Sequence, residues 1–417
     1  MQNDKLTKVN NAELPAPSSA PEREKSENVL IRWIGGIDRP FLFLLIILLA
    51  LGTVMVFTAS YSFAQTRYGD SYYFSKKQII WIVVGLAVMM LAIHIPDRWV
   101  KKYAWLVYLL AVALNAAVYI MGVAKHGAQR WIDIGPIRFQ PSEVLKFATI
   151  LVCAKVIANN TEKIKKFRFG VLPFIVFAFI GCALLVLQSH LSATIITFVI
   201  IFAMMFIGGS KLLWVGVFGG IPVAIGMYAV TNIDTIINWS LVQKFLGHTY
   251  TRLLVWTDPF KYMRDDATGW AGWQPAQSIY AISSGGVWGV GLGQSMQKHG
   301  YLPEPQNDYI FAILCEEFGF VGAVAVIGLF AALIIRGFII ARNCRDKFCQ
   351  MVIYGLMIKL AMQVIFNIGV VTGTLPATGI SLPFFSYGGT ALIMSLVEMG
   401  IVLSFSRYSY TERGTDK

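Results

Sequence analysis

The stretch PEPQNDYIFAILCEEFGFVG, residues 303–322, passes from turn-forming polar residues into an apolar helical pattern. One acid, Asp308, stands at this junction, and Glu316 and Glu317 follow about two turns later. Such a run is typical of a membrane-spanning helix that begins where water meets lipid. Because acids inside a membrane are costly, these three carboxylates need a physical explanation.

The whole chain has the composition of a membrane protein. Of its 417 residues, 56% are hydrophobic and only 14% are charged, which is more apolar surface than a soluble domain can bury. The predicted fold class is therefore an all-α polytopic membrane protein with about ten transmembrane helices. The apolar runs cover residues 41–63, 78–95, 103–122, 143–158, 171–187, 190–207, 212–231, 309–335, 351–371 and 384–405.

The positions of lysine and arginine predict the orientation. They are concentrated in 1–40, 96–102, 159–170 and 336–350, which share one side of the membrane if both termini do. Because basic loops normally stay inside, we expect both termini in the cytoplasm, with 1–40 as a disordered tail and 408–417 as a short one. The net charge of +12 then belongs to loops beside anionic lipid, which argues against nucleic-acid binding. The first apolar run is too long for a signal-peptide core, so we expect no cleaved leader.

A long external loop, residues 232–308, connects the seventh and eighth predicted helices. Loops of this length are usually functional or disordered, and this one combines many glycines with several tryptophans. That mixture favours amphipathic pieces lying on the outer leaflet. We therefore expect the working surface of the protein in this loop, within a membrane domain that spans residues 41–407.

A second polar region is GAQRWIDIGPIRFQPSEVLK, residues 127–146. Glu143 and Lys146 are three residues apart on one helix face, so each can offset the burial cost of the other, and a structural salt bridge is predicted. Arg130 and Arg138 lie outside and close to the membrane, where they are suited to hold a phosphate.

Several other patterns do not identify a site. The segment SEVLK (142–146) has three residues between its serine and lysine and lacks the accompanying transpeptidase motifs, which excludes a serine transpeptidase. The glycine-rich segment 283–295 lacks the strand and the Lys-Ser/Thr pair of a nucleotide loop. The five cysteines and five histidines show no disulfide framework and no zinc spacing, so a metal site stays unknown.

Two interpretations of the acids remain open at this point. Asp308 is either an acid stabilised by the helix dipole or a base whose pKa is raised at a low-dielectric boundary. Glu316 and Glu317 either support the contact between helices or act directly. The residues alone therefore leave a transporter and a lipid-processing enzyme as alternatives.

A resemblance to a known family separates these alternatives. The chain contains, in this order, GAQRWIDIGPIRFQPSEVLK, QSHLSATI, WTDPF, GWQPAQSIYAISSGG, GLGQSMQK, YLPEPQNDYIFAILCEEFGFVG and LPATGISLPFFSYGGT. Together these blocks resemble the SEDS family (shape, elongation, division and sporulation), and the long N-terminal tail is most like the FtsW and SpoVE branch rather than RodA. The sequence departs from the family at Gln306-Asn307, where His-Thr is common, and at 188–190, where Gln-Pro-Asp is usual.

The resemblance implies a peptidoglycan glycosyltransferase that polymerises lipid II at the outer face of the cytoplasmic membrane. The essential acid of the family corresponds to Asp308, and a functionally important pair corresponds to Glu143 and Lys146. Further candidate substrate-binding or supporting residues in the matching blocks are Gln274, Gln277, Ser278, Lys298, Glu304 and Glu316.

The implied mechanism is an inverting transfer with Asp308 as general base. Arg130, Arg138 or a divalent cation (Mg²⁺ or Mn²⁺) would offset the charge of the leaving diphosphate. Since transpeptidase motifs are absent, the resemblance implies a class B penicillin-binding protein as partner, alongside other division proteins. A lipid II flippase would need a polar path and internal repeats, and a scaffold would tolerate loss of Asp308. A role in division, elongation or spore cortex formation stays open.

Overall fold

The computed structural model describes residues 36–121, 123–125, 128–134, 137–232, 235 and 248–410. The predicted N-terminal tail therefore lies almost entirely outside the described residues, as do residues 411–417 of the predicted C-terminal tail. The chain from Ile37 onward forms one unit, to which the following description refers.

The fold is helical, as predicted, and each predicted apolar run falls on a helix. Seven helices are long and apolar enough to cross a membrane among the described residues, and two shorter apolar helices accompany them. The fold class is therefore confirmed as a polytopic helical membrane protein. The long elements are α2 (Arg39–Tyr68), α3 (Tyr73–Ile93), α4 (Asp97–Met121), α5 (Pro141–Asn159), α7 (Leu172–Leu187), α8 (Leu191–Ile207), α9 (Leu212–Val215) continued by η1 (Gly216–Gly220) and α10 (Ile221–Thr231), then α15 (Ile310–Asn343), α16 (Lys347–Val371) and α17 (Gly389–Tyr410).

Several helices extend beyond the predicted apolar runs. Helix α15, for example, continues to Asn343 rather than ending near residue 335, and its Arg336 is paired with Asp38 at 2.6 Å between Nη2 and Oδ2. Asp38 also caps α2 by accepting a hydrogen bond from the backbone N–H of Phe41 at 2.9 Å. Helix α17 begins at Gly389 rather than at residue 384, since the preceding segment with Pro383 forms turns.

The all-α prediction is confirmed for the bundle, and one small sheet accompanies it. The segment after α4 contains a small antiparallel sheet of three strands in the order β1 (Val123–Lys125), β2 (Ala128–Ile134) and β3 (Ile137–Phe139). In its second pair Ile132 lies opposite Phe139. Strands this short carry little sequence pattern, and they are stable here because the sheet is joined to the helical bundle.

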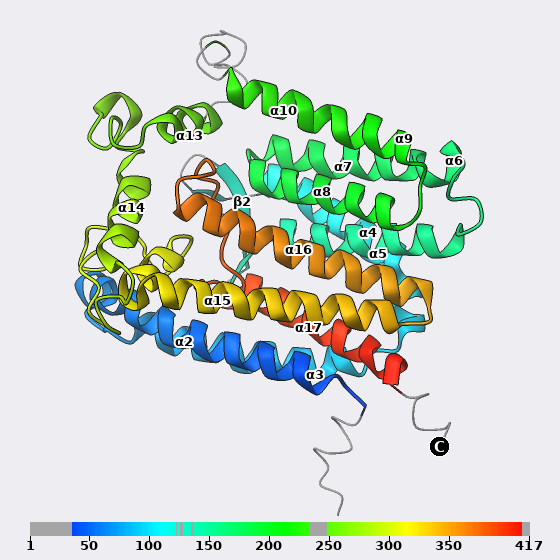
Figure 1. Cartoon of the computed structure of the whole chain (residues 1–417), viewed down its shortest axis with the longest axis horizontal. Coiled ribbons are helices and arrows are strands. Elements are labelled where there is room, and N and C mark those ends of the chain that lie inside the picture. The colour runs from blue at the N-terminus through cyan, green and yellow to red at the C-terminus, as the bar shows by residue number, and fades with distance from the viewer. Residues whose placement is uncertain are drawn as a thin grey trace, which may run out of the picture. The chain divides into compact units, whose positions relative to one another are not determined.

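The core lies around α5 and α16. Helix α5 packs against α4, α8 and α16, and α16 also packs against α15. Figure 1 shows α2, α15, α16 and α17 running side by side, in agreement with the contacts of α15 with each of the other three. The outer helices expose apolar side chains such as Phe43, Leu91 and Phe179, as expected of surfaces that face lipid.

The long loop that follows α10 contains helices among its described residues. Besides turns it forms α13 (His248–Thr257), the short 3-10 helix η2 (Asp266–Thr268) and α14 (Trp273–Gly285). Two hydrogen bonds join it to the C-terminal end of α16. Trp256 Nε1 donates to the carbonyl of Gly373 at 2.9 Å, and Ser278 Oγ donates to the carbonyl of Val371 at 2.7 Å. The loop is therefore fixed to the bundle at the end that holds Asp308.

Candidate active site

Asp308 lies just before α15, and its backbone is held by a single side chain of α16. Asn367, which is buried, donates from Nδ2 to the carbonyl of Asp308 at 2.7 Å and to the carbonyl of Ile380 at 2.8 Å. Because a buried amide with two acceptors has few other arrangements, Asn367 fixes the start of α15 against the 372–388 connection. The acid is thus presented by a rigid backbone.

The carboxylate of Asp308 shares its surroundings with Arg130 of β2. Both approach Gly379, whose φ of +73° favours glycine. A Cβ atom at this position would lie 3.4 Å from Asp308 Oδ2 and 3.8 Å from Arg130 Nη1. Glycine therefore keeps open the space beside a carboxylate and a guanidinium that come from distant parts of the chain.

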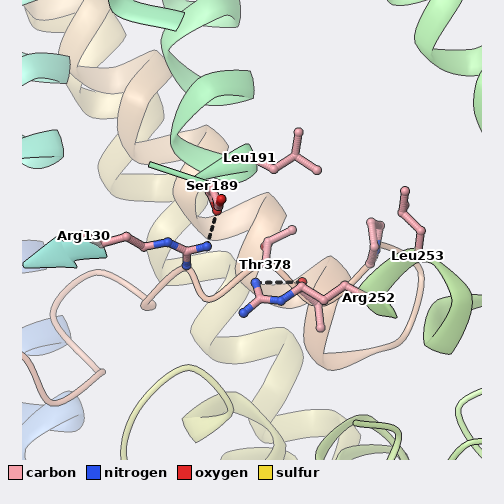
Figure 2. A pocket seen from close by; sticks show the side chains of 8 residues that line it. Arg130, Ser189, Leu191, Arg252, Leu253 and Thr378 are labelled. Carbon is pink, nitrogen blue, oxygen red and sulfur yellow. Dashed lines mark hydrogen bonds between the residues drawn. The ribbon is translucent and has the colours of Figure 1, made fainter. Parts of the chain in front are cut away.

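A second arginine, Arg252 of α13, meets Arg130 in one pocket. Figure 2 shows the two guanidinium groups extending towards Thr378 from opposite sides. Arg130 Nη2 donates to the carbonyl of Ser189, and Arg252 Nη1 donates to the carbonyl of Ala377 at 3.3 Å. The remaining lining residues are Leu191, Leu253 and Pro376. The pocket therefore combines an apolar wall with two forked cationic donors.

The electrostatics of this pocket favour an anion. Burial lowers the pKa of Arg130, the like charge of Arg252 lowers that pKa further, and Asp308 opposes both. The guanidinium still stays protonated at neutral pH, since its ordinary pKa is far above 7. Arg130 Nε is buried and has no hydrogen-bond partner among the described residues. A phosphate group would satisfy this donor and offset the repulsion between the two arginines.

The predicted ion pair of Glu143 and Lys146 is present as part of a larger network. Lys146 Nζ lies 2.6 Å from Glu143 Oε1 on α5. Lys359 of α16 lies 3.1 Å from Glu143 Oε2 and 2.5 Å from Oε1 of Glu398 on α17. All four side chains are buried, and their formal charges cancel. This balance makes four charges tolerable inside the helical bundle.

Helix α16 connects this network to the backbone of Asp308. Lys359, Gln363 and Asn367 follow one another at intervals of four residues and therefore share one helix face. Gln363 Nε2 lies 3.4 Å from Glu143 Oε2, between the contacts that Lys359 and Asn367 make. One polar stripe thus runs along α16 from the buried charges to the start of α15.

Arg138 is placed apart from the other arginines. Its Nε lies 3.5 Å from Oδ1 of Asp133 on the neighbouring strand, and its side chain is 61% exposed. It does not line the pocket of Arg130 and Arg252. The second arginine that lines this pocket is therefore Arg252, and phosphate binding by Arg138 stays a prediction.

The other candidate residues lie in and around α14 and the first part of α15. Gln274 Nε2 donates to the carbonyl of Pro303 at 3.1 Å, and Gln277 is buried on the same helix, α14. Glu304 accepts from Asn307 Nδ2 at 2.8 Å. None of the predicted residues Gln274, Gln277, Ser278, Lys298, Glu304 and Glu316 lines the pocket of Arg130 and Arg252.

Four residues of this region were not predicted from the sequence: Arg252, Asn367, Lys359 and Glu398. Lys359 and Glu398 could have been predicted to form an ion pair, since charged residues inside membrane helices require partners of opposite sign. Arg252 is the one charged residue in the stretch TYTRLLVWT of the long loop, and only the tertiary structure brings it to Arg130.

The described side chains do not form a metal site. They contain no group of three or more His, Cys, Asp or Glu residues that could hold a metal ion. Mg²⁺ is commonly held by one or two carboxylates together with substrate phosphates, so a divalent cation that binds with the substrate stays a prediction.

Comparisons with known proteins agree with this architecture. A family model described as "Cell cycle protein", which covers FtsW, RodA and SpoVE, matches residues 39–411. Stage V sporulation protein E of Bacillus subtilis is 34% identical over 375 residues, which cover 87% of this chain and 95% of that protein. The probable peptidoglycan glycosyltransferase FtsW of the same organism is 33% identical over 397 residues, which cover 93% of this chain and 95% of that protein.

Solved structures show the same fold. A chain from a study of polymerization and crosslinking by a peptidoglycan synthase complex matches with a TM-score of 0.69, at 25% identity, over 90% of this chain and 99% of that one. The rod shape determining protein RodA of Thermus thermophilus matches with a TM-score of 0.63, at 25% identity, over 90% of this chain and 98% of that one. The chain belongs to the FtsW, RodA and SpoVE family of cell cycle proteins.

Proposed function

We propose that this chain polymerises lipid II into glycan strands by an inverting transfer in which Asp308 is the general base. One observation carries the proposal: the Asp308 carboxylate and the Arg130 guanidinium converge on Gly379, beside a pocket that also holds Arg252. A base next to two phosphate-binding groups suits a reaction in which a hydroxyl attacks and a diphosphate leaves.

The enzyme class is that of the family. Relatives at 32–34% identity carry the name peptidoglycan glycosyltransferase, in organisms as different as Saccharophagus degradans, Bacillus subtilis and a Geobacter species. The match to the sporulation protein supports a role in division or in sporulation.

The chemistry follows from the charges in the site. The 4-hydroxyl of one lipid II attacks the anomeric carbon of the second and transfers its proton to Asp308. The bond from that carbon to the diphosphate breaks, and undecaprenyl diphosphate leaves with its added negative charge stabilised by Arg130 and Arg252. Because the attack is in line with the leaving group, an α-linked donor gives a β-linked strand.

Partner and location belong to the same proposal. The similar structure from a study of polymerization and crosslinking by a peptidoglycan synthase complex supports a class B penicillin-binding protein as the crosslinking partner. The basic segments predicted to be cytoplasmic support a position in the cytoplasmic membrane with Asp308 at the outer face.

The test is glycan-strand formation from purified lipid II by the complex of the chain with its partner transpeptidase. Asp308→Asn should lower the rate by about 100-fold or more, because the amide cannot accept the proton. Asp70→Asn is the matched control, since Asp70 lies at the external end of α2 and pairs with exposed Lys76. Equal rates for wild type and Asp308→Asn would remove Asp308 from the mechanism.

A further inference from the structure

Helix α15 is interrupted after its first nine residues. Within its 34 residues, Gly319 has φ +65° and ψ −166°, which no helical residue adopts. The interruption separates the part that begins just after Asp308, residues 310–318, from the longer part, residues 320–343. The glycine-rich segment 286–298 lies against this interruption, and we call that segment the splint.

The splint and α15 exchange backbone hydrogen bonds. In a regular helix the N–H groups of Phe320 and Val321 would donate to the carbonyls of Glu316 and Glu317. Instead, the Phe320 N–H donates to the carbonyl of Gly286 at 2.9 Å, and the Val321 N–H donates to the carbonyl of Val287 at 3.1 Å.

The two carbonyls that lose their helical donors are satisfied by the same segment. The carbonyl of Glu316 accepts from Val290 N–H at 3.0 Å, and that of Glu317 accepts from Gly291 N–H at 3.0 Å. These four backbone groups therefore all stay bonded at the interruption, which matters because unpaired backbone groups at a membrane are costly.

The side chains of the two glutamates hold the splint in place. Glu316 accepts from Ser295 Oγ at 2.5 Å and from the backbone N–H of Met296 at 2.9 Å. Glu317 pairs with Lys298 at 3.0 Å, and Lys298 Nζ also donates to the carbonyl of Gly293 at 2.6 Å. Both carboxylates are buried, so their partners are needed for the fold to tolerate them.

We propose that the splint fixes the direction of residues 310–318, and therefore of Asp308, and that Glu316 and Glu317 are positioning residues. The inference rests on the proposed role of Asp308 as base. Asn367 fixes the start of this short helical part, and the splint fixes its end. Since a displacement of about 1 Å can lower a catalytic rate strongly, both attachments serve the geometry of the reaction.

The contact requires glycine on both sides. A Cβ atom at Gly319 would lie 2.3 Å from the backbone nitrogen of Gly289 and 2.5 Å from the carbonyl oxygen of Val287. A Cβ atom at Gly289, whose φ is +82°, would lie 2.2 Å from the carbonyl oxygen of Glu317. Alanine at either position must therefore separate the splint from α15.

The chain offers a matched control for each substitution. Gly328 lies in the same helix as Gly319, and Gly300 lies just beyond the splint with φ +94°, a positive value like that of Gly289. A Cβ atom at either control position would have no neighbour within 4 Å in the described structure. Gly300→Ala therefore introduces backbone strain at a positive φ without the steric contact, and Gly328→Ala removes a glycine from α15 without it.

The experiment measures lipid II polymerisation by the full chain with its partner, together with hydrogen exchange of the same samples in lipid nanodiscs. We expect Gly319→Ala and Gly289→Ala to lower kcat at least 10-fold with KM within twofold of wild type. Amide exchange should rise in 286–298 and 310–321. Gly328→Ala and Gly300→Ala should leave both readouts unchanged. A purely structural role would lower Tm without lowering the kcat of the folded protein.

The result that overturns the proposal is an unchanged kcat in Gly319→Ala and Gly289→Ala while Asp308→Asn is inactive. If instead Asp308→Asn keeps wild-type polymerisation, the proposed function fails. Amide hydrogen exchange alone then tests whether the splint fixes residues 310–318. Slow exchange of 286–298 and 310–321 in wild type and fast exchange in both alanine variants would then support it. Equal exchange in all samples would overturn it.

Discussion

Asp308 obtains its surroundings from residues that are far apart in the chain. Arg130 comes from the small sheet, Arg252 from α13, Gly379 from the connection before α17, and Asn367 from α16. Their contributions differ, since the arginines supply positive charge, the glycine leaves space, and the asparagine holds the backbone. An acid at a helix start is common, and these neighbours give this one its chemical role.

At this scale we predict separate effects for the two pocket arginines and for a surface arginine. Arg130→Gln and Arg252→Gln should each lower kcat/KM for lipid II by about 10- to 100-fold, because a charge-assisted hydrogen bond to phosphate contributes about 1.5–3 kcal/mol. Arg67→Gln is the control, since Arg67 is exposed at the end of α2. Steady-state polymerisation against lipid II concentration measures the effect. Wild-type kcat/KM in both pocket variants would contradict a diphosphate site.

Among the elements, α16 organises both the site and the buried charges. Its polar stripe of Lys359, Gln363 and Asn367 contacts α5, α17 and the start of α15 in turn. Because the network contains two glutamates and two lysines, removing one charge leaves a net charge in a low-dielectric interior, whereas removing one of each sign leaves a neutral pair.

The second prediction follows from this balance. Lys359→Met should lower the free energy of unfolding by about 3–5 kcal/mol, because Glu398 then loses its cation. Glu398→Leu should also lower the free energy of unfolding, because Lys359 then loses one of its carboxylates. The double variant should lower it by less than the sum of the two single variants. Reversible unfolding in mixed detergent micelles, analysed as a double-mutant cycle, measures the coupling. Additive losses would show that the two side chains do not depend on each other.

At the scale of the whole molecule, the orientation in the membrane is the property that connects fold to function. A lipid-linked substrate on the outer leaflet can reach Asp308 only if the sheet, α13 and α14 all lie outside. The basic segment between α5 and α7 must then lie inside.

The third prediction tests this orientation with introduced cysteines. The five native cysteines are free, and four of them are buried, so the background should be low. Lys261→Cys, in the external loop, should react with a membrane-impermeant maleimide added to intact cells, and Thr161→Cys, after α5, should not. In inverted vesicles Thr161→Cys should react with the maleimide, and Lys261→Cys should not. Labelling of both positions from one side would exclude the proposed topology.

The sequence determined the elements of this protein and their chemical character. In lipid every backbone group must bond within its own segment, so an apolar run long enough to span becomes a helix whatever its neighbours are. For the same reason the polar residues in and beside these runs stood out, and Asp308, Arg130 and the pair of Glu143 and Lys146 could be identified as candidates from the sequence alone.

Only the tertiary structure decided how these residues meet. Sequence patterns could not reveal the sheet before α5, the approach of Arg252 to Arg130, or the hydrogen bond from Asn367 to the backbone of Asp308. Each of these depends on contacts between residues far apart in the chain. The interruption of α15 shows this most clearly. The N–H groups of Phe320 and Val321 and the carbonyls of Glu316 and Glu317 would be bonded in a regular helix, and they are also bonded in the interrupted one. The choice between them depends on whether a glycine-rich segment from elsewhere in the chain can approach closely enough, and that is a property of packing rather than of local sequence.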